Sequence, residues 1–373
     1  MIIYIITIFL SVLFTYSAIR YRNKYKENDY RNYKYMYILC AFLAFLIPCM
    51  VSGFRAYTVG TDTPGTYYNL YNLAQNISIY DAMRDKGYAL INRLIYVLFD
   101  NYTGVLVLTS IIMYGCCFYS IFKISDNPTL STYFLFTTNV YFIMMNMIRE
   151  SLAISIFILL IPYMMKKDRK SFIIFLIGTL IAFSMHPTAI VFILLYFLFN
   201  FIKINEKRVI ILTIINAVFA KYIIKVALLL LGKITYFNTY FAWYLKSEYN
   251  TGKFNFFSFG IIFSVLILVL IAYKYAKNDN KYKLLLWLTT IATNILLYSP
   301  YLPLMQRTSW LFSMPIFVLI PTVFKYLEEK DRKKSNIIKI LMLGGYTLYM
   351  ICTIFVMGYH DVTPYHTIFY KVD

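Results

Sequence analysis

Charged residues interrupt the apolar segments of this chain at several separate places. Arg149 is followed by Glu150, and His186 is followed by a proline. Arg307 stands shortly after a segment rich in helix breakers, residues 299–303. An arginine fork suits phosphate oxygens, a neutral histidine can take a proton from a hydroxyl, and a carboxylate can act as a base. These residue types favour a substrate that carries phosphate oxygens and a hydroxyl group that can lose a proton.

The longest polar connection, residues 54–102, adds further candidates. Its stretch 59–65 is typical of a turn, because glycine permits positive φ and proline pre-sets φ for a turn. Asp62 in this stretch is either a functional carboxylate or an ordinary turn residue, while Asp85 and Lys86 are interpreted as solvated loop charges. Tyrosines in such a loop can pack on sugar faces. The candidates in this connection are Arg55, Thr61, Asp62, Tyr67, Tyr71 and Tyr88.

The other charged candidates also have structural interpretations. Arg55 can extend to the membrane interface from a helix end, as Arg307 can from the start of a span. Arg149 and Glu150 can close a tight turn as a pair, and His186 can cap a helix. Ionisable groups at membrane depth are costly and usually mark a site or a pathway. Their recurrence in four regions of the chain therefore favours a functional site.

The elements that must position these residues are long apolar segments. Of the 373 residues, 60% are hydrophobic and 14% are charged, and the mean hydropathy is +0.63. A soluble domain carries about 25% charged residues, whereas a membrane-spanning helix needs roughly 20 mostly apolar residues. The five cysteines lie in or beside apolar segments without metal-ligand spacing, so we expect small buried side chains. The sequence predicts an all-α, polytopic integral membrane protein.

The apolar runs predict about twelve transmembrane helices in a single domain that covers residues 1–373. The first span is expected to be retained, because it lacks the basic start and the cleavage site of a signal peptide. Residues 87–99 are predicted to form an interfacial or re-entrant helix within the external connection. The predicted spans are 2–19, 36–53, 103–122, 129–147, 151–165, 171–185, 188–202, 209–231, 256–273, 284–299, 308–324 and 337–356.

The positive charge predicts the orientation of these spans. The chain has 36 lysines and arginines and a net charge of +19. Most of the basic residues lie in one set of alternate loops, which the positive-inside rule assigns to the cytoplasm. Both termini and the 54–102 connection are then external. Because the basic clusters lie between spans and not on a soluble aromatic platform, the charge does not indicate nucleic-acid binding.

Short motifs also follow one another in a distinctive order between the spans. They are Phe54-Arg55, Gly60-Thr61-Asp62, Gly87-Tyr88, Arg149-Glu150-Ser151, His186-Pro187-Thr188, Arg307 and, near the end, Pro364-Tyr365. This series resembles the EpsG-like family of Wzy-type polymerases of bacterial exopolysaccharide, capsule and O-antigen, over nearly the whole chain. The chain departs from the family pattern at Asp85-Lys86, where Glu-Pro is common, and at Glu150, where Gln is common.

The resemblance implies a GT-C-like glycosyl transfer at the outer face of the bacterial inner membrane. A sugar hydroxyl of one undecaprenyl-diphosphate-linked repeat unit attacks the anomeric carbon of the growing chain, and undecaprenyl diphosphate leaves. Because the long connection has no DxD-type acidic pair, we expect no metal and no cofactor, with arginine stabilising the leaving group.

Specific roles follow from this resemblance for the candidate residues. The diphosphate is predicted to be held by Arg149 and Arg307, assisted by Arg55. The predicted base is His186, with Asp62 or Glu150 as the second choice. The residues predicted to contact sugars or shape the loop are Thr61, Tyr67, Tyr71 and Tyr88.

Other classes of membrane protein remain open. A flippase for lipid-linked oligosaccharides shares the span count and the basic cavity, but it usually has two repeated halves, and we find no repeat. There are three further alternatives: another membrane glycosyltransferase such as an O-antigen ligase, a membrane acyltransferase, and a structural subunit. The expected partners are the undecaprenyl-diphosphate-linked oligosaccharide, membrane lipids and a chain-length regulator.

Overall fold

The computed structural model covers the whole chain and describes residues 1–76, 85–231, 233 and 252–369. In these residues the backbone is helical throughout, apart from turns and one isolated antiparallel bridge between Arg55 and Thr367. The chain divides into two compact units, Met1–Phe197 with Ile337–Asp373, and Leu198–Asn336. Part of the predicted loop, residues 77–84, lies outside the described residues. The prediction of a single domain stays a prediction.

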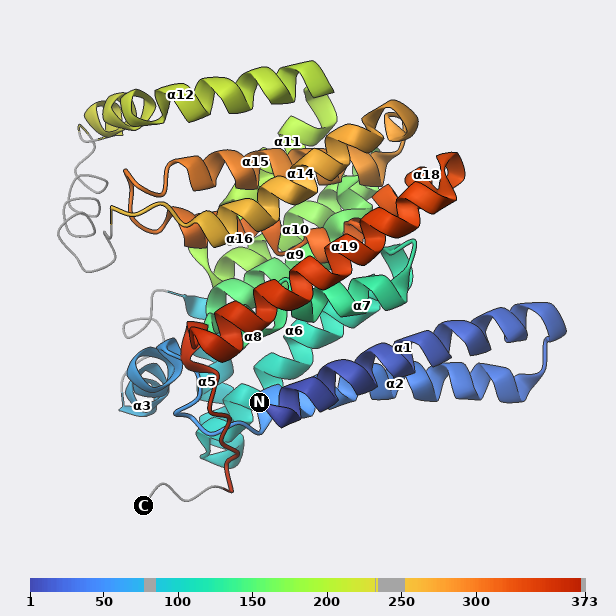
Figure 1. Cartoon of the computed structure of the whole chain (residues 1–373). Coiled ribbons are helices and arrows are strands. Elements are labelled where there is room, and N and C mark those ends of the chain that lie inside the picture. Colours follow the sequence, from blue (N-terminus) through green and yellow to red (C-terminus); the bar gives the residue numbers. More distant parts are fainter. Residues whose placement is uncertain (77–84, 232, 234–251, 370–373) are drawn as a thin grey trace. The chain divides into compact units, whose positions relative to one another are not determined.

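The first unit contains most of the helices and the long connection (Figure 1). Its elements are α1 (Ile2–Asn28), α2 (Arg31–Gly53), the π-helix η1 (Thr63–Tyr67), α3 (Tyr68–Asn76), α5 (Lys86–Phe99), α6 (Tyr102–Ile124), α7 (Pro128–Thr137), α8 (Val140–Asn146), α9 (Ile148–Met164), α10 (Arg169–Met185), η2 (Pro187–Ile190), the start of α11 (Val191–Phe201), most of α19 (Arg332–Met350), η3 (Ile351–Val356) and η4 (Tyr359–Asp361).

The second unit is described by itself. Its elements are α12 (Glu206–Leu231), α14 (Phe256–Ala276), α15 (Asn280–Leu297), α16 (Met305–Ser313), α17 (Ile316–Leu319) and α18 (Pro321–Lys330). Helix α15 packs against α12, α14 and α16. Gln306 anchors the start of α16, because its amide donates to Ser258 Oγ at 3.0 Å and accepts from Asn255 at 3.0 Å.

Six described helices are long and apolar enough to cross a bilayer: Ile2–Asn28, Arg31–Gly53, Tyr102–Ile124, Glu206–Leu230, Phe256–Ala276 and Arg332–Val356. A seventh candidate is a helix pair, Met305–Leu319 with Pro321–Lys330, that is bent by 46°. The prediction of an all-α, polytopic membrane protein is thus confirmed. The count of about twelve spans is not, because several predicted spans correspond to shorter helices such as α9 and α10, each of 17 residues.

Buried hydroxyl pairs join the helices of the first unit. Helices α1 and α2 form an antiparallel pair, and α6 packs between α2 and α9 (Figure 1). Ser52 on α2 and Ser110 on α6 lie 2.9 Å apart, and Thr15 on α1 lies 3.1 Å from Thr132 on α7. Such pairs hold apolar helices together where water is absent, since small side chains let the backbones approach closely.

The predicted span 129–147 is broken into α7 and α8. Asn139 stands at the break with φ of 65°, in the left-handed region, and its side-chain amide donates to Thr353 Oγ1 at 2.7 Å. Asparagine tolerates this conformation better than most residues. Helix α8 then ends at Asn146, and α9 begins two residues later. The end of α8 and the start of α9 therefore meet among buried side chains, beside the long connection.

The C-terminal segment, residues 358–369, folds back along the long connection (Figure 1). Ala56 N donates to His366 O at 2.8 Å, and Ile368 N donates to Phe54 O at 3.1 Å. Tyr4 near the start of α1 donates to Val362 O at 2.7 Å. The start of α1 and residues 358–369 thus pack on the same end of the first unit.

Candidate functional site

The turn after α2 begins with a buried arginine. Arg55 has no exposed surface, and its guanidinium donates to the main-chain oxygens of Ser52 and, at 2.6 Å, of Met145. Arg55 therefore joins the end of α2 to the end of α8. Arg55 thus holds these two helix ends together, and its contact with a diphosphate stays a prediction.

Gly60 allows the turn to reach the next element. Its φ of 105° is a conformation that side chains rarely adopt, and a Cβ there would lie 2.8 Å from Thr63 Oγ1. The main chain is held on both sides, since Gly60 N donates to Asp361 O at 2.9 Å and Thr61 N donates to His360 O at 3.0 Å. Thr61 Oγ1 also donates to the Asp361 carboxylate at 3.1 Å.

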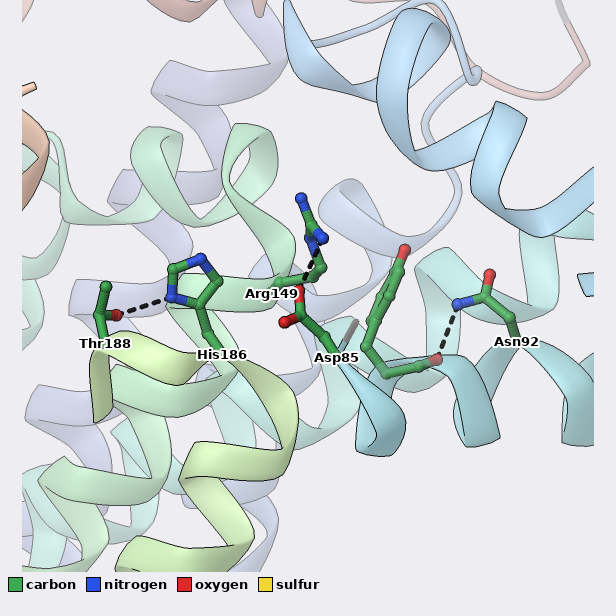
Figure 2. A network of polar contacts seen from close by, with 6 residues as sticks. Asp85, Asn92, Arg149, His186 and Thr188 are labelled. Carbon is green, nitrogen blue, oxygen red and sulfur yellow. Dashed lines mark hydrogen bonds and ion pairs between the residues drawn. The ribbon is translucent and has the colours of Figure 1, made fainter. Parts of the chain in front are cut away.

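Four side chains form what is called the Arg149 cluster below: Asp85, Arg149, Tyr67 and Tyr88. An ion pair lies at its centre (Figure 2). Arg149 Nη1, on the first turn of α9, donates to Asp85 Oδ2 at 2.6 Å. The Asp85 side chain is 4% exposed and the Arg149 side chain 26%. The interpretation of Asp85 as a solvated loop charge is therefore wrong. Nothing in the sequence indicates this pairing, because the two residues are 64 positions apart.

Two buried tyrosines flank this ion pair. The Arg149 guanidinium lies 5.5 Å from the centre of the Tyr67 ring, in the geometry of a cation–π contact. The Tyr67 and Tyr88 rings meet edge to face at 5.7 Å. Burial raises the pKa of Tyr67 to about 12, although the Arg149 charge opposes this shift. Burial also raises the pKa of Tyr88 well above its usual value. Both phenols therefore stay protonated at neutral pH.

An asparagine connects the turn, α8 and the C-terminal segment. Asn146 Oδ1 accepts from Asp62 N at 2.7 Å, and Asn146 Nδ2 lies 3.3 Å from His360 Nδ1. Because the Asp62 N–H orients the amide, Nδ2 faces the imidazole as a donor. Asn146, His360 and Asp361 were missed by the sequence reasoning. His360 and Asp361 both have positive φ although neither is glycine, and this mark of a constrained site is visible only in the structure.

His186 lies at the junction of α10 and η2. Its Nδ1 is 2.7 Å from Thr188 Oγ1, within the network drawn in Figure 2. The start of α5 packs against the end of α10, because a Cβ on Gly87 would lie 2.3 Å from Ser184 Oγ. The segments that carry Asp85 and His186 are therefore neighbours.

The remaining candidates are placed as follows. Glu150 is buried in the first turn of α9, next to Arg149. Tyr71 on α3 is 3% exposed and contacts the ring of Tyr102 at 5.6 Å. Arg307 is half-buried on α16 of the second unit. The joint action of Arg149 and Arg307 on one diphosphate stays a prediction.

The fold and this cluster define a class, namely a polytopic helical membrane protein with a buried charged and aromatic site beside its first long connection. The family model described as the EpsG family matches residues 38–367. The chain belongs to the EpsG family, as the motif series predicted. This membership indicates a Wzy-like, glycosyltransferase-type polymerase of exopolysaccharide. No curated protein and no solved structure matches the chain significantly.

Proposed function

We propose that this protein joins lipid-linked repeat units into a polysaccharide at the outer face of the cytoplasmic membrane. A sugar hydroxyl of the incoming unit attacks the anomeric carbon of the growing chain. The bond from that carbon to the diphosphate oxygen breaks, the diphosphate leaves with the electron pair, and a base takes the hydroxyl proton. Undecaprenyl diphosphate is the leaving group that the family resemblance implies.

The surroundings of Arg149 carry this proposal. Nη1 is engaged by Asp85, but the buried Nε has no hydrogen-bond partner among the residues that the structure describes. A buried donor without an acceptor is costly, and a phosphate oxygen would satisfy it. Arg149 also lies in the first turn of α9, where the positive end of the helix dipole favours an anion. Charge that develops on the leaving diphosphate would be stabilised there.

Three residues near Arg149 are candidates for the base. His186 lies on the segment that packs beside the start of α5, and Thr188 holds its Nδ1. Asp62 is held by Asn146 and lies near Tyr67. Glu150 follows Arg149 directly. His186 stays our first choice, because a neutral imidazole can accept a proton near pH 7.

Helix α5 has the surface expected of a helix at the membrane interface. One of its faces packs inward through Tyr88, Ile91 and Ile95, while Leu94 and Val97 are exposed on the other, at 48% and 66%. An exposed apolar face of this kind favours a helix that lies in the bilayer interface. A lipid-linked substrate would then approach the Asp85–Arg149 pair from the membrane side.

A deletion strain separates this proposal from a flippase. Without a polymerase, single lipid-linked repeat units accumulate on the outer side of the membrane, where an added impermeant glycosidase or lectin reaches them. Without a flippase, the same units accumulate inside and stay protected. Protected units in the deletion strain would refute the polymerase proposal.

A further inference from the structure

A second hollow lies beside the Arg149 cluster in the first unit. It is a cavity of about 400 Å³ between the long connection, α3, the junction of α5 and α6, and the C-terminal segment. Its lining includes the four tyrosines Tyr57, Tyr68, Tyr71 and Tyr102, together with Asn72 and Asp100. This volume lies in the range of small-molecule sites, roughly 300–1,000 Å³.

Two of the tyrosines that line this cavity have buried hydroxyls without a partner. Tyr71 and Tyr102 are 3% and 6% exposed, and neither hydroxyl finds a hydrogen-bond partner among the described residues. Burying a hydroxyl without a partner destabilises the fold. Two such groups on one cavity point to a ligand that itself carries hydroxyls.

The aromatic faces fit the same kind of ligand. The Tyr57 and Tyr68 rings stack with their centres 4.8 Å apart, and Tyr68 meets Tyr102 edge to face at 5.3 Å. A sugar ring has apolar faces and a polar rim, so it packs on tyrosine rings while its hydroxyls bond at their edges. Asn72 and Asp100 add amide and carboxylate groups to the wall.

The charge of the cavity excludes a phosphate. Among the described residues that line it, none is lysine or arginine, and Asp100 is acidic. A diphosphate would therefore be repelled here and attracted to Arg149. Tyr67 contacts Arg149, whereas its neighbour Tyr68 lines the cavity. These two consecutive residues thus face the two different sites.

We propose that this tyrosine cavity binds one uncharged sugar ring, which packs against the Tyr57–Tyr68 stack and bonds to the hydroxyls of Tyr71 and Tyr102. The assignment of that ring to the repeat unit rests on the proposed polymerase function. The binding itself does not, because it follows from the cavity alone. The cavity and the Arg149 cluster would then hold the glycan and the diphosphate of the substrates separately.

Binding of simple glycosides tests this proposal without any turnover. The full chain is placed in lipid nanodiscs, which avoid sugar-headed detergents. Methyl β-glucoside, methyl β-galactoside and the methyl glycoside of N-acetylglucosamine are each added at millimolar concentration. Saturation-transfer NMR then reports contact between ligand and protein. We expect a signal from at least one glycoside, and a decrease of fivefold or more in the double variant Tyr71→Phe, Tyr102→Phe.

Two comparisons make the result specific. The Tyr96→Phe variant removes a hydroxyl from a ring that touches Tyr71 but does not line the cavity, so its signal should equal that of the wild type. The double variant should also melt no lower than the wild type, because the lost hydroxyls had no partner. An equal signal in the double variant, or no signal from any of the three glycosides, would overturn the proposal. Neither outcome depends on the polymer assay in cells.

Discussion

Arg149 and Asp85, which are 64 positions apart in the chain, form a short ion pair of 2.6 Å at the start of α9. The pair fixes the direction of the guanidinium while leaving its Nε for another acceptor. In this arrangement Asp85 positions Arg149 and does not itself need to contact the substrate.

Substitutions of Asp85 test this division of roles. We expect Asp85→Ala to lower the free energy of unfolding by about 1.5–3 kcal/mol, the usual contribution of a hydrogen bond to a charged group. Asp85→Asn keeps an acceptor and should be less destabilised. Polymer yield per membrane-inserted protein should decrease in the order wild type, Asp85→Asn, Asp85→Ala, Arg149→Ala. An Asp85→Ala protein with unchanged melting temperature and no activity would assign Asp85 a direct part in the reaction.

Replacing Asn146 should lower the polymer yield by more than the loss of folding stability explains. Asn146→Leu removes the partner of Asp62 N and of His360, and an unmet polar group destabilises by about 1–3 kcal/mol when it is buried. Thr353→Val is the matched control, because it removes the acceptor of the buried Asn139 amide at the other end of α8 without changing the residue at the left-handed position. With similar melting temperatures, we expect at least tenfold less polymer from Asn146→Leu than from Thr353→Val. Equal yields would make the Asn146 network purely structural.

His186 and Thr188 should differ in the size of their effects. General-base catalysis contributes about 10²- to 10⁴-fold, so His186→Ala should lower turnover by this factor. Thr188→Val removes only the group that orients the imidazole and should have a smaller effect. Initial polymerisation rates in isolated membranes provide the measurement. Wild-type rates in His186→Ala would move the role of base to Asp62 or Glu150.

The raised pKa of Tyr67 predicts how its stability contribution varies with pH. The folded-state pKa of about 12 exceeds the ordinary tyrosine pKa of 10.0, so the unfolded chain ionises first as pH rises. The contribution of Tyr67 is complete below pH 10 and is lost as pH rises towards 12, by at most about 3 kcal/mol. Melting temperatures of wild type and Tyr67→Phe should keep a constant difference from pH 7 to 9.5. Above pH 10 the wild type should lose more stability than Tyr67→Phe, and parallel curves throughout would contradict the assignment.

The helical framework could be predicted from apolar runs because the bilayer imposes length and hydrophobicity on its helices. Residues 87–99 were predicted to be helical, and α5 covers them. The break at Asn139 was not predicted, because a polar residue within an apolar run leaves the hydropathy almost unchanged. The same holds for the number of spans, since short apolar helices cannot be told from full spans by composition.

The candidate site was predictable only in part, for a similar reason. Arg149 and Tyr67 were singled out by residue type and position, and the structure brings them into contact. The contacts of the C-terminal segment with the turn at Gly60 run through main-chain groups, which every residue has. The side-chain hydrogen bond between Thr61 and Asp361 leaves no mark in the sequence either, because the two residues are 300 positions apart.

In the proposed reaction Arg149 holds the leaving diphosphate. The most direct measurement is complementation of a deletion strain with Arg149→Ala, Arg307→Ala and, as control, Arg93→Ala, an arginine of the same connection that packs over Tyr96. Polymer length and lipid-linked intermediates are analysed, with membrane levels matched. We expect roughly 100-fold less polymer from Arg149→Ala, with single lipid-linked units outside, and normal polymer from Arg93→Ala. Normal amount and length of polymer from both Arg149→Ala and Arg307→Ala would contradict the proposal that these arginines hold the leaving diphosphate.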